Sequence, residues 1–82
     1  MSNQMEQSIL RAGMTPRQRQ VCDGLMDGLG NEAIAARTGT SVSNIKHILK
    51  ALFKSFQIGN GPHDWKRMKL ALELIRYGFK GE

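Results

Sequence analysis

The sequence predicts a small all-α protein, built as a four-helix helix-turn-helix domain. Three observations favour this fold class. Apolar side chains recur at helical spacing, good capping residues stand at the expected helix starts, and no segment shows the alternation of a half-buried strand. With 82 residues, the chain has the length of one domain. We expect a short amino-terminal arm or helix over 1–13 and the helical domain over 14–82.

The first helix of the predicted domain has clear signals at both ends. Thr15 and Gln18 have the spacing of a capping box, and Gly28 is a natural carboxy-terminal cap. Gly24 inside the helix costs up to about 1 kcal/mol relative to alanine. We therefore expect Gly24 to allow close packing there.

A tight turn that contains a glycine joins the next two predicted helices. Asn31 is expected to cap the first of them, which ends over 38–40. The second runs over about 41–56, and the serine at its start is again a capping residue. Two helices joined in this way form the helix-turn-helix pattern. A loop over 59–62 then leads to a last helix over about 63–77.

Helix 41–56 has two contrasting faces when its residues are placed about 100° apart. Its apolar face, which we expect in the core, contains Ile45, Ile48, Leu49, Leu52 and Phe56. Its opposite face contains Ser43, Lys46, His47, Lys50 and Lys54. No acidic residue occurs between Glu32 and Asp64, so this second face has only one sign of charge.

A basic and hydroxyl face of this kind suits a helix in the major groove of duplex DNA. Lysine can contact guanine or a phosphate, serine can contact either, and histidine can reach a base edge. Lys54 lies late on the helix, where a backbone contact is expected. Residues 41–82 account for the whole net charge of +5, which also favours an acidic partner, with double-stranded DNA first. The alternative interpretation is an ordinary solvated helix face.

Several separated stretches share residue type and spacing with a known family. They are the run from Met14 to Val21, Gly28-Leu29-Gly30-Asn31, Ile34-Ala35-Ala36-Arg37, Ser41 and Asn44-Ile45-Lys46. Together they resemble the DNA-binding domain of the LuxR/GerE family of transcriptional regulators, over about 14–58. Residues 1–13 are too few for a sensor domain, so we expect a stand-alone module in the cytoplasm, associated with the nucleoid.

The resemblance implies sequence-specific transcriptional regulation, with 41–56 as the recognition helix and dimerisation through the last helix. The site residues that it implies are Lys46, His47 and Lys50 for base contacts, and Arg17, Ser43 and Asn44 for backbone contacts. The chain departs from the family at Ala33, where glutamate is usual, and at Ile48, where histidine is usual. These departures leave room for an alternative function, an interaction protein that forms a heterodimer with a full-length LuxR-type regulator and antagonises it.

The last helix has two apolar stripes on nearly opposite sides. The first contains Trp65, Met68, Leu72, Ile75 and Phe79, and we expect it to pack on the core. The second contains Leu70, Leu74 and Tyr77. A helix packed on a small domain needs only one apolar stripe, so the second is the predicted interface of a symmetric homodimer. The alternative is that Ile9 and Leu10 cover it.

Other classes of site find little support. No Ser, His and acid constellation indicates catalysis, and His47 and His63 have no neighbouring ligands at metal spacing. We therefore expect no enzyme, metal or cofactor. Cys22 lies on an apolar helix face, where a buried structural thiol is expected. The chain shows no signal peptide and no run of about 20 apolar residues, so a membrane partner is not expected.

Overall fold

The computed structural model describes residues 13–79, which fold into four helices with no strand among them. The helices are α2 (Pro16–Met26), α3 (Asn31–Thr38), α4 (Val42–Ser55) and α5 (His63–Tyr77). The all-α class is therefore confirmed for this part of the chain. Apart from Gly13, the predicted arm over 1–13 lies outside the described residues, and so do Ile9 and Leu10.

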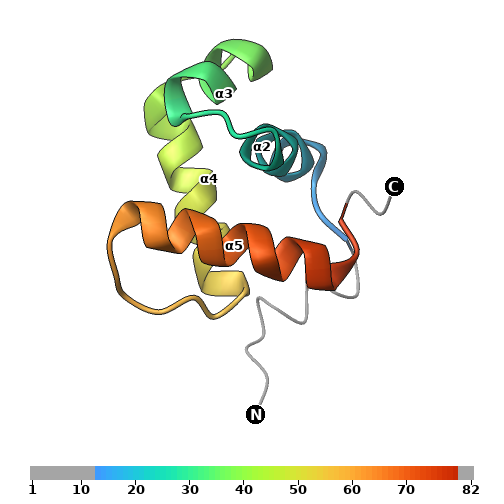
Figure 1. The fold of residues 1–82 in the computed structure, drawn as a ribbon. Helices are drawn as coiled ribbons and strands as arrows, with labels where there is room; N and C mark the ends of the chain where they lie inside the picture. Colours follow the sequence, from blue (N-terminus) through green and yellow to red (C-terminus); the bar gives the residue numbers. More distant parts are fainter. Residues whose placement is uncertain (1–12, 80–82) are drawn as a thin grey trace.

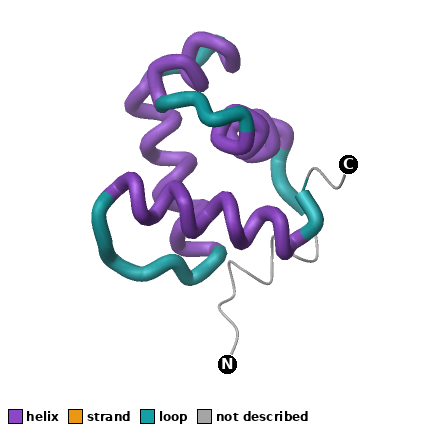
Figure 2. The backbone as a smooth tube through the Cα atoms, in the orientation of Figure 1, coloured by secondary structure: helices purple, strands orange, loops and turns teal. Residues whose placement is uncertain are grey.

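The helices α2 and α4 contact each other, and each also contacts α3 and α5 (Figure 1). The helix α3 packs on α2 and α4, and α5 packs on α2 and α4 from the other end of the domain. A long loop carries the chain from the end of α4 back to the start of α5, whereas the turns between α2, α3 and α4 are short (Figure 2). The start of α5 therefore returns to the side of α4.

Every described helix contributes to one hydrophobic core. Its members are Val21, Cys22, Leu25, Ile34, Ala35, Ile45, Leu49, Leu52, Phe53, Phe56, Leu70, Leu74 and Phe79. A Cβ atom on Gly24 would lie 2.7 Å from Cγ1 of Ile34, so the glycine allows α2 and α3 to approach each other. The close packing expected at Gly24 is confirmed.

The predicted caps are confirmed at two helices and wrong at a third. In α2, Oγ1 of Thr15 accepts a hydrogen bond from the backbone N–H of Gln18 at 3.1 Å, and the reciprocal bond of the capping box is 3.0 Å. In α4, Oγ of Ser41 accepts from a backbone N–H at 3.0 Å. The cap of α3 is Gly30 rather than Asn31, which is the first helical residue.

The two faces of α5 are the reverse of the prediction. Leu70 and Leu74 are 0% exposed and belong to the core, and Tyr77 is half-buried against it. The assignment of Leu70 and Leu74 to a dimer interface is therefore wrong, and of the predicted interface only Tyr77 is partly exposed. Four of the five residues predicted to pack on the core are exposed instead, namely Trp65 at 37%, Met68 at 54%, Leu72 at 49% and Ile75 at 59%.

Two features explain this orientation of α5. Arg67 lies one turn before Leu70, and its half-buried guanidinium donates hydrogen bonds to the Asn31 side chain and the Leu29 carbonyl oxygen. This pairing allows a charged residue to stand on the inward face. At the other end, Gly78 has a φ of 95°, and the N–H of Phe79 donates to the Leu74 carbonyl at 2.9 Å. Phe79 is thus buried, as predicted, but it reaches the core from beyond the helix.

Candidate functional site

The outer face of α4 carries an exposed row of polar and basic side chains. Its members are Ser43, Lys46, His47, Lys50 and Lys54, all of which are exposed. On the opposite side of the same helix, Ile45, Leu49 and Leu52 are buried in the core. Burial of the apolar face therefore fixes the rotation of α4, and that rotation turns the basic row toward solvent.

The turn between α3 and α4 holds the amino-terminal end of this row in place. Gly39 has a φ of 71°, which ends α3 and redirects the chain. The amide nitrogen Nδ2 of Asn44 donates to Oγ1 of Thr40 at 3.0 Å, so this half-buried side chain faces the turn. Arg17, from the start of α2, donates to the Thr38 carbonyl at 3.0 Å. Three of the four residues predicted to contact a DNA backbone, Arg17, Ser43 and Asn44, thus lie at one end of the row.

Lys54 lies at the other end of the row. A shallow hollow lies between Lys54 and the middle of the row. The hollow has a volume of about 350 Å³ and is lined by His47, Lys50, Ala51 and Lys54. The three predicted base-contacting residues lie between the two ends. Lys46 and His47 are adjacent on one turn of α4, and Lys50 lies on the next turn. The structure therefore places all of the DNA-contact residues predicted from the sequence on α4, except Arg17, which reaches the end of α3 from the start of α2.

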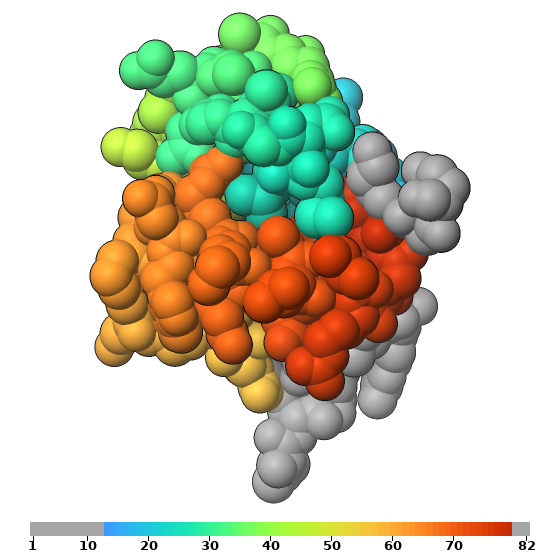
Figure 3. All heavy atoms as spheres, in the orientation of Figure 1, coloured from blue at the N-terminus to red at the C-terminus, as the bar shows by residue number. Residues whose placement is uncertain are grey.

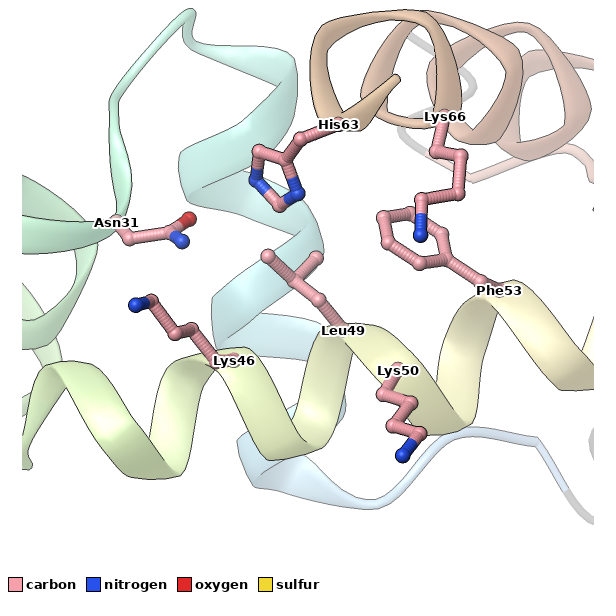
Figure 4. A pocket seen from close by; sticks show the side chains of 7 residues that line it. All are labelled: Asn31, Lys46, Leu49, Lys50, Phe53, His63 and Lys66. Atoms are coloured by element: carbon pink, nitrogen blue, oxygen red, sulfur yellow. The ribbon is translucent and has the colours of Figure 1, made fainter. Parts of the chain in front are cut away.

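A second hollow, which sequence reasoning missed, lies between α4 and the start of α5 (Figure 4). Its volume is about 500 Å³, and it is lined by Asn31, Lys46, Leu49, Lys50, Phe53, His63 and Lys66. We call it the α4–α5 hollow. The sequence signal that points to it is the glycine-rich loop over 59–62, which allows α5 to start beside α4. This loop alone does not specify that the start of α5 packs against α4.

Arg67 lies near this hollow, at the start of α5. Partial burial lowers the pKa of its guanidinium, and the nearby Asp64 carboxylate partly opposes this effect. Its hydrogen bonds to Asn31 and to the Leu29 carbonyl tie the start of α5 to the segment before α3. Arg67 thereby positions α5 relative to the rest of the domain.

The described residues include no cluster of metal-ligating side chains, and their one cysteine is buried. No three His, Cys, Asp or Glu side chains within 13–79 come close enough to hold a metal ion. Burial raises the pKa of the Cys22 thiol to about 12, with Asp23 adding to this effect and Arg19 opposing it. The thiol is therefore a poor nucleophile, and its predicted burial is confirmed. None of the helices over this part of the chain is long and apolar enough to cross a bilayer.

Comparisons with protein families, curated proteins and solved structures find no match to this chain. The likeness to the LuxR/GerE family therefore stays a resemblance over residues 14–58. What the protein does has to be inferred from the surfaces described above.

Proposed function

We propose that this protein is a non-enzymatic, sequence-specific transcriptional regulator that binds duplex DNA with α4 as its recognition helix. The observation that carries the proposal is the exposed row on α4, which has three lysines and a histidine and no acidic neighbour on the same helix. Exposed helix faces usually mix both signs of charge. A face of one sign is expected where the partner is a polyanion.

The dimensions of α4 fit this role. A helix of 14 residues is about 21 Å long, and the major groove, about 12 Å wide and 8.5 Å deep, admits one α-helix. Lys46 and Lys50 are one turn apart at the middle of the exposed face, where base edges would lie. Ser43 and Lys54 stand toward the two ends, where the phosphates of the flanking strands would lie.

Alanine variants test the assignment of base and phosphate contacts. We expect Lys50→Ala to weaken specific binding by about 1–3 kcal/mol. We expect Lys54→Ala to weaken binding to all sequences evenly and to reduce the salt slope, which is the slope of the logarithm of the binding constant against the logarithm of salt concentration, by about one. The matched control is Lys69→Ala, which removes the same charge from α5. The measurement is electrophoretic retardation at several salt concentrations, with duplexes selected from a random library. Wild-type affinity in the Lys46/Lys50 double alanine variant would contradict the proposal.

The partner proposed for α5 is a second copy of the chain. Trp65, Met68, Leu72 and Ile75 form an exposed apolar strip, which we call the α5 strip. Figure 3 shows α5 crossing the front of the molecule with no other described helix over it. Two copies joined about a two-fold axis would cover this strip on both chains, and they would favour an inverted-repeat site with half-sites about 34–36 Å apart.

Sedimentation of wild type and Leu72→Arg tests the dimer. Because Leu72 is half exposed, arginine there should leave the fold intact and yield a monomer of normal helical content. A wild type that is monomeric at tens of micromolar would contradict the dimer. A wild type that binds no duplex, yet pairs with a LuxR-type regulator through the α5 strip, would favour the antagonist alternative.

A further inference from the structure

The α4–α5 hollow combines an apolar floor with a basic rim. Leu49 and Phe53 from α4 form the floor, and both are buried in the core. Lys46 reaches along one side toward Asn31, and the His63 ring hangs over the middle from the start of α5 (Figure 4). Lys66 enters from the opposite side, whereas Lys50 lines the outer edge with its amine pointing away from His63 and Lys66 (Figure 4). Groups from α3, α4 and α5 thus surround one space.

The ring of Phe53 holds two of the rim groups in place. Nζ of Lys66 lies 5.2 Å from the centre of this ring, in a cation–π contact. The His63 ring meets it edge to face, with 6.3 Å between the ring centres. These contacts orient a cation and a ring that can donate a hydrogen bond before any ligand is present, which lowers the cost of ordering them on binding.

The charge around the hollow is unbalanced. The amino-terminal ends of α3 and α5 flank the hollow, and no described side chain accepts a hydrogen bond from the free backbone N–H groups at either end. Arg67 adds a positive charge in the adjoining space beside the start of α3. Two acidic groups oppose these charges, Glu32 beside the α3 start and Asp64 in the first turn of α5. Neither acid lines the α4–α5 hollow itself, where the basic side chains are Lys46, Lys50, His63 and Lys66.

We infer that the α4–α5 hollow is a binding site for a phosphate group. A phosphate has oxygens in several directions, so it can accept hydrogen bonds at once from amines, an imidazole and backbone N–H groups on different elements. Two sources can supply it, a strand of the DNA proposed above or a free phosphorylated molecule. Only the first source depends on the proposed function, because a free phosphate would bind without DNA.

Titration of the intact protein with inorganic phosphate tests the site directly. Backbone amide resonances are followed at constant ionic strength, with sodium chloride as the reference. We expect saturable shifts at Asn31, His63 and Lys66 that chloride does not reproduce. Lys66→Gln should weaken phosphate binding at least threefold, and Lys66→Arg, which keeps the charge, should retain it.

The matched control is Lys69→Gln, because Lys69 also makes a cation–π contact on α5, at 5.8 Å from the Trp65 ring, but does not line the hollow. Equal phosphate affinity in the Lys66→Gln and Lys69→Gln variants, both folded by circular dichroism, would overturn the site. So would the absence of saturable shifts in the wild type.

Duplex binding by the same variants distinguishes the two sources. If the phosphate belongs to DNA, Lys66→Gln lowers the salt slope of duplex binding by about one relative to Lys69→Gln. If it belongs to a free molecule, the two slopes agree while Lys66→Gln still weakens inorganic phosphate binding. A protein that binds phosphate as expected but no duplex would refute the DNA proposal and leave this site intact.

Discussion

Truncation of Leu74 tests the observed orientation of α5, with Leu72 as the matched control on the same helix. The Leu74 side chain is 0% exposed, whereas Leu72 is 49% exposed. Truncating a buried leucine to alanine costs about 2–5 kcal/mol, which combines lost burial and the cavity left behind. An exposed substitution stays within about 0.5 kcal/mol. The structure therefore predicts that two identical substitutions, two residues apart, differ by at least about 1.5 kcal/mol in the free energy of unfolding.

This difference is large for a chain of this size. A protein of 82 residues has a total stability of roughly 4–12 kcal/mol. Since 1 kcal/mol shifts Tm by about 4–8 °C in domains of 60–100 residues, Leu74→Ala should lower Tm by roughly 10 °C or more. Thermal and urea unfolding followed by circular dichroism measure both variants, at two protein concentrations so that any dimer contribution is recognised. Equal losses, or a larger loss for Leu72→Ala, would show that α5 is turned the other way.

The remaining predictions concern three other positions. Cys22 should react with a thiol reagent only as fast as the protein unfolds, because burial raises its pKa to about 12; fast native labelling would be inconsistent with a buried α2 face. Between about pH 9 and 12 the thiol ionises in the unfolded chain but stays protonated in the folded one. The free energy of unfolding should therefore hold its full value below pH 9 and decline as the pH rises from about 9 toward 12, more steeply in wild type than in Cys22→Ala. Arg67→Ala should cost about 1.5–3 kcal/mol through its lost hydrogen bonds, against under about 1 kcal/mol for the exposed Arg76→Ala, as measured by urea unfolding. Gly24→Ala should destabilise despite the helix propensity of alanine, because Ile34 occupies the space; a stabilised variant would argue against the observed α2–α3 packing.

The orientation of α4 could be predicted from the sequence because its two faces differ in kind. One side is mainly apolar and the other is mainly polar, so only one rotation buries the first and exposes the second. The caps at Thr15 and Ser41 were equally readable, because each bond joins residues three positions apart. These features are local, and local patterns are what a sequence displays directly.

The orientation of α5 depends on contacts that a local pattern does not display. Both of its stripes are apolar, so periodicity alone gave no preference between them. The structure places Arg67 on the inward face, with partners 36 and 38 residues away in the chain. A charged residue normally indicates an exposed face, and only the distant partners reverse that reading. The α4–α5 hollow was missed for the same reason, because it assembles from three separate helices.

The helix α5 connects the two surfaces on which the proposed function depends. Its inward residues, Leu70 and Leu74, pack in the same core as the buried face of α4. Its outward residues form the α5 strip, through which a second copy is proposed to bind. Because a close-packed core transmits displacement, the position of α4 relative to a dimer axis is set by the packing beneath α5. Substitutions that loosen this packing would therefore change the distance between two recognition helices, and with it the preferred spacing of half-sites, without touching any residue proposed to contact DNA.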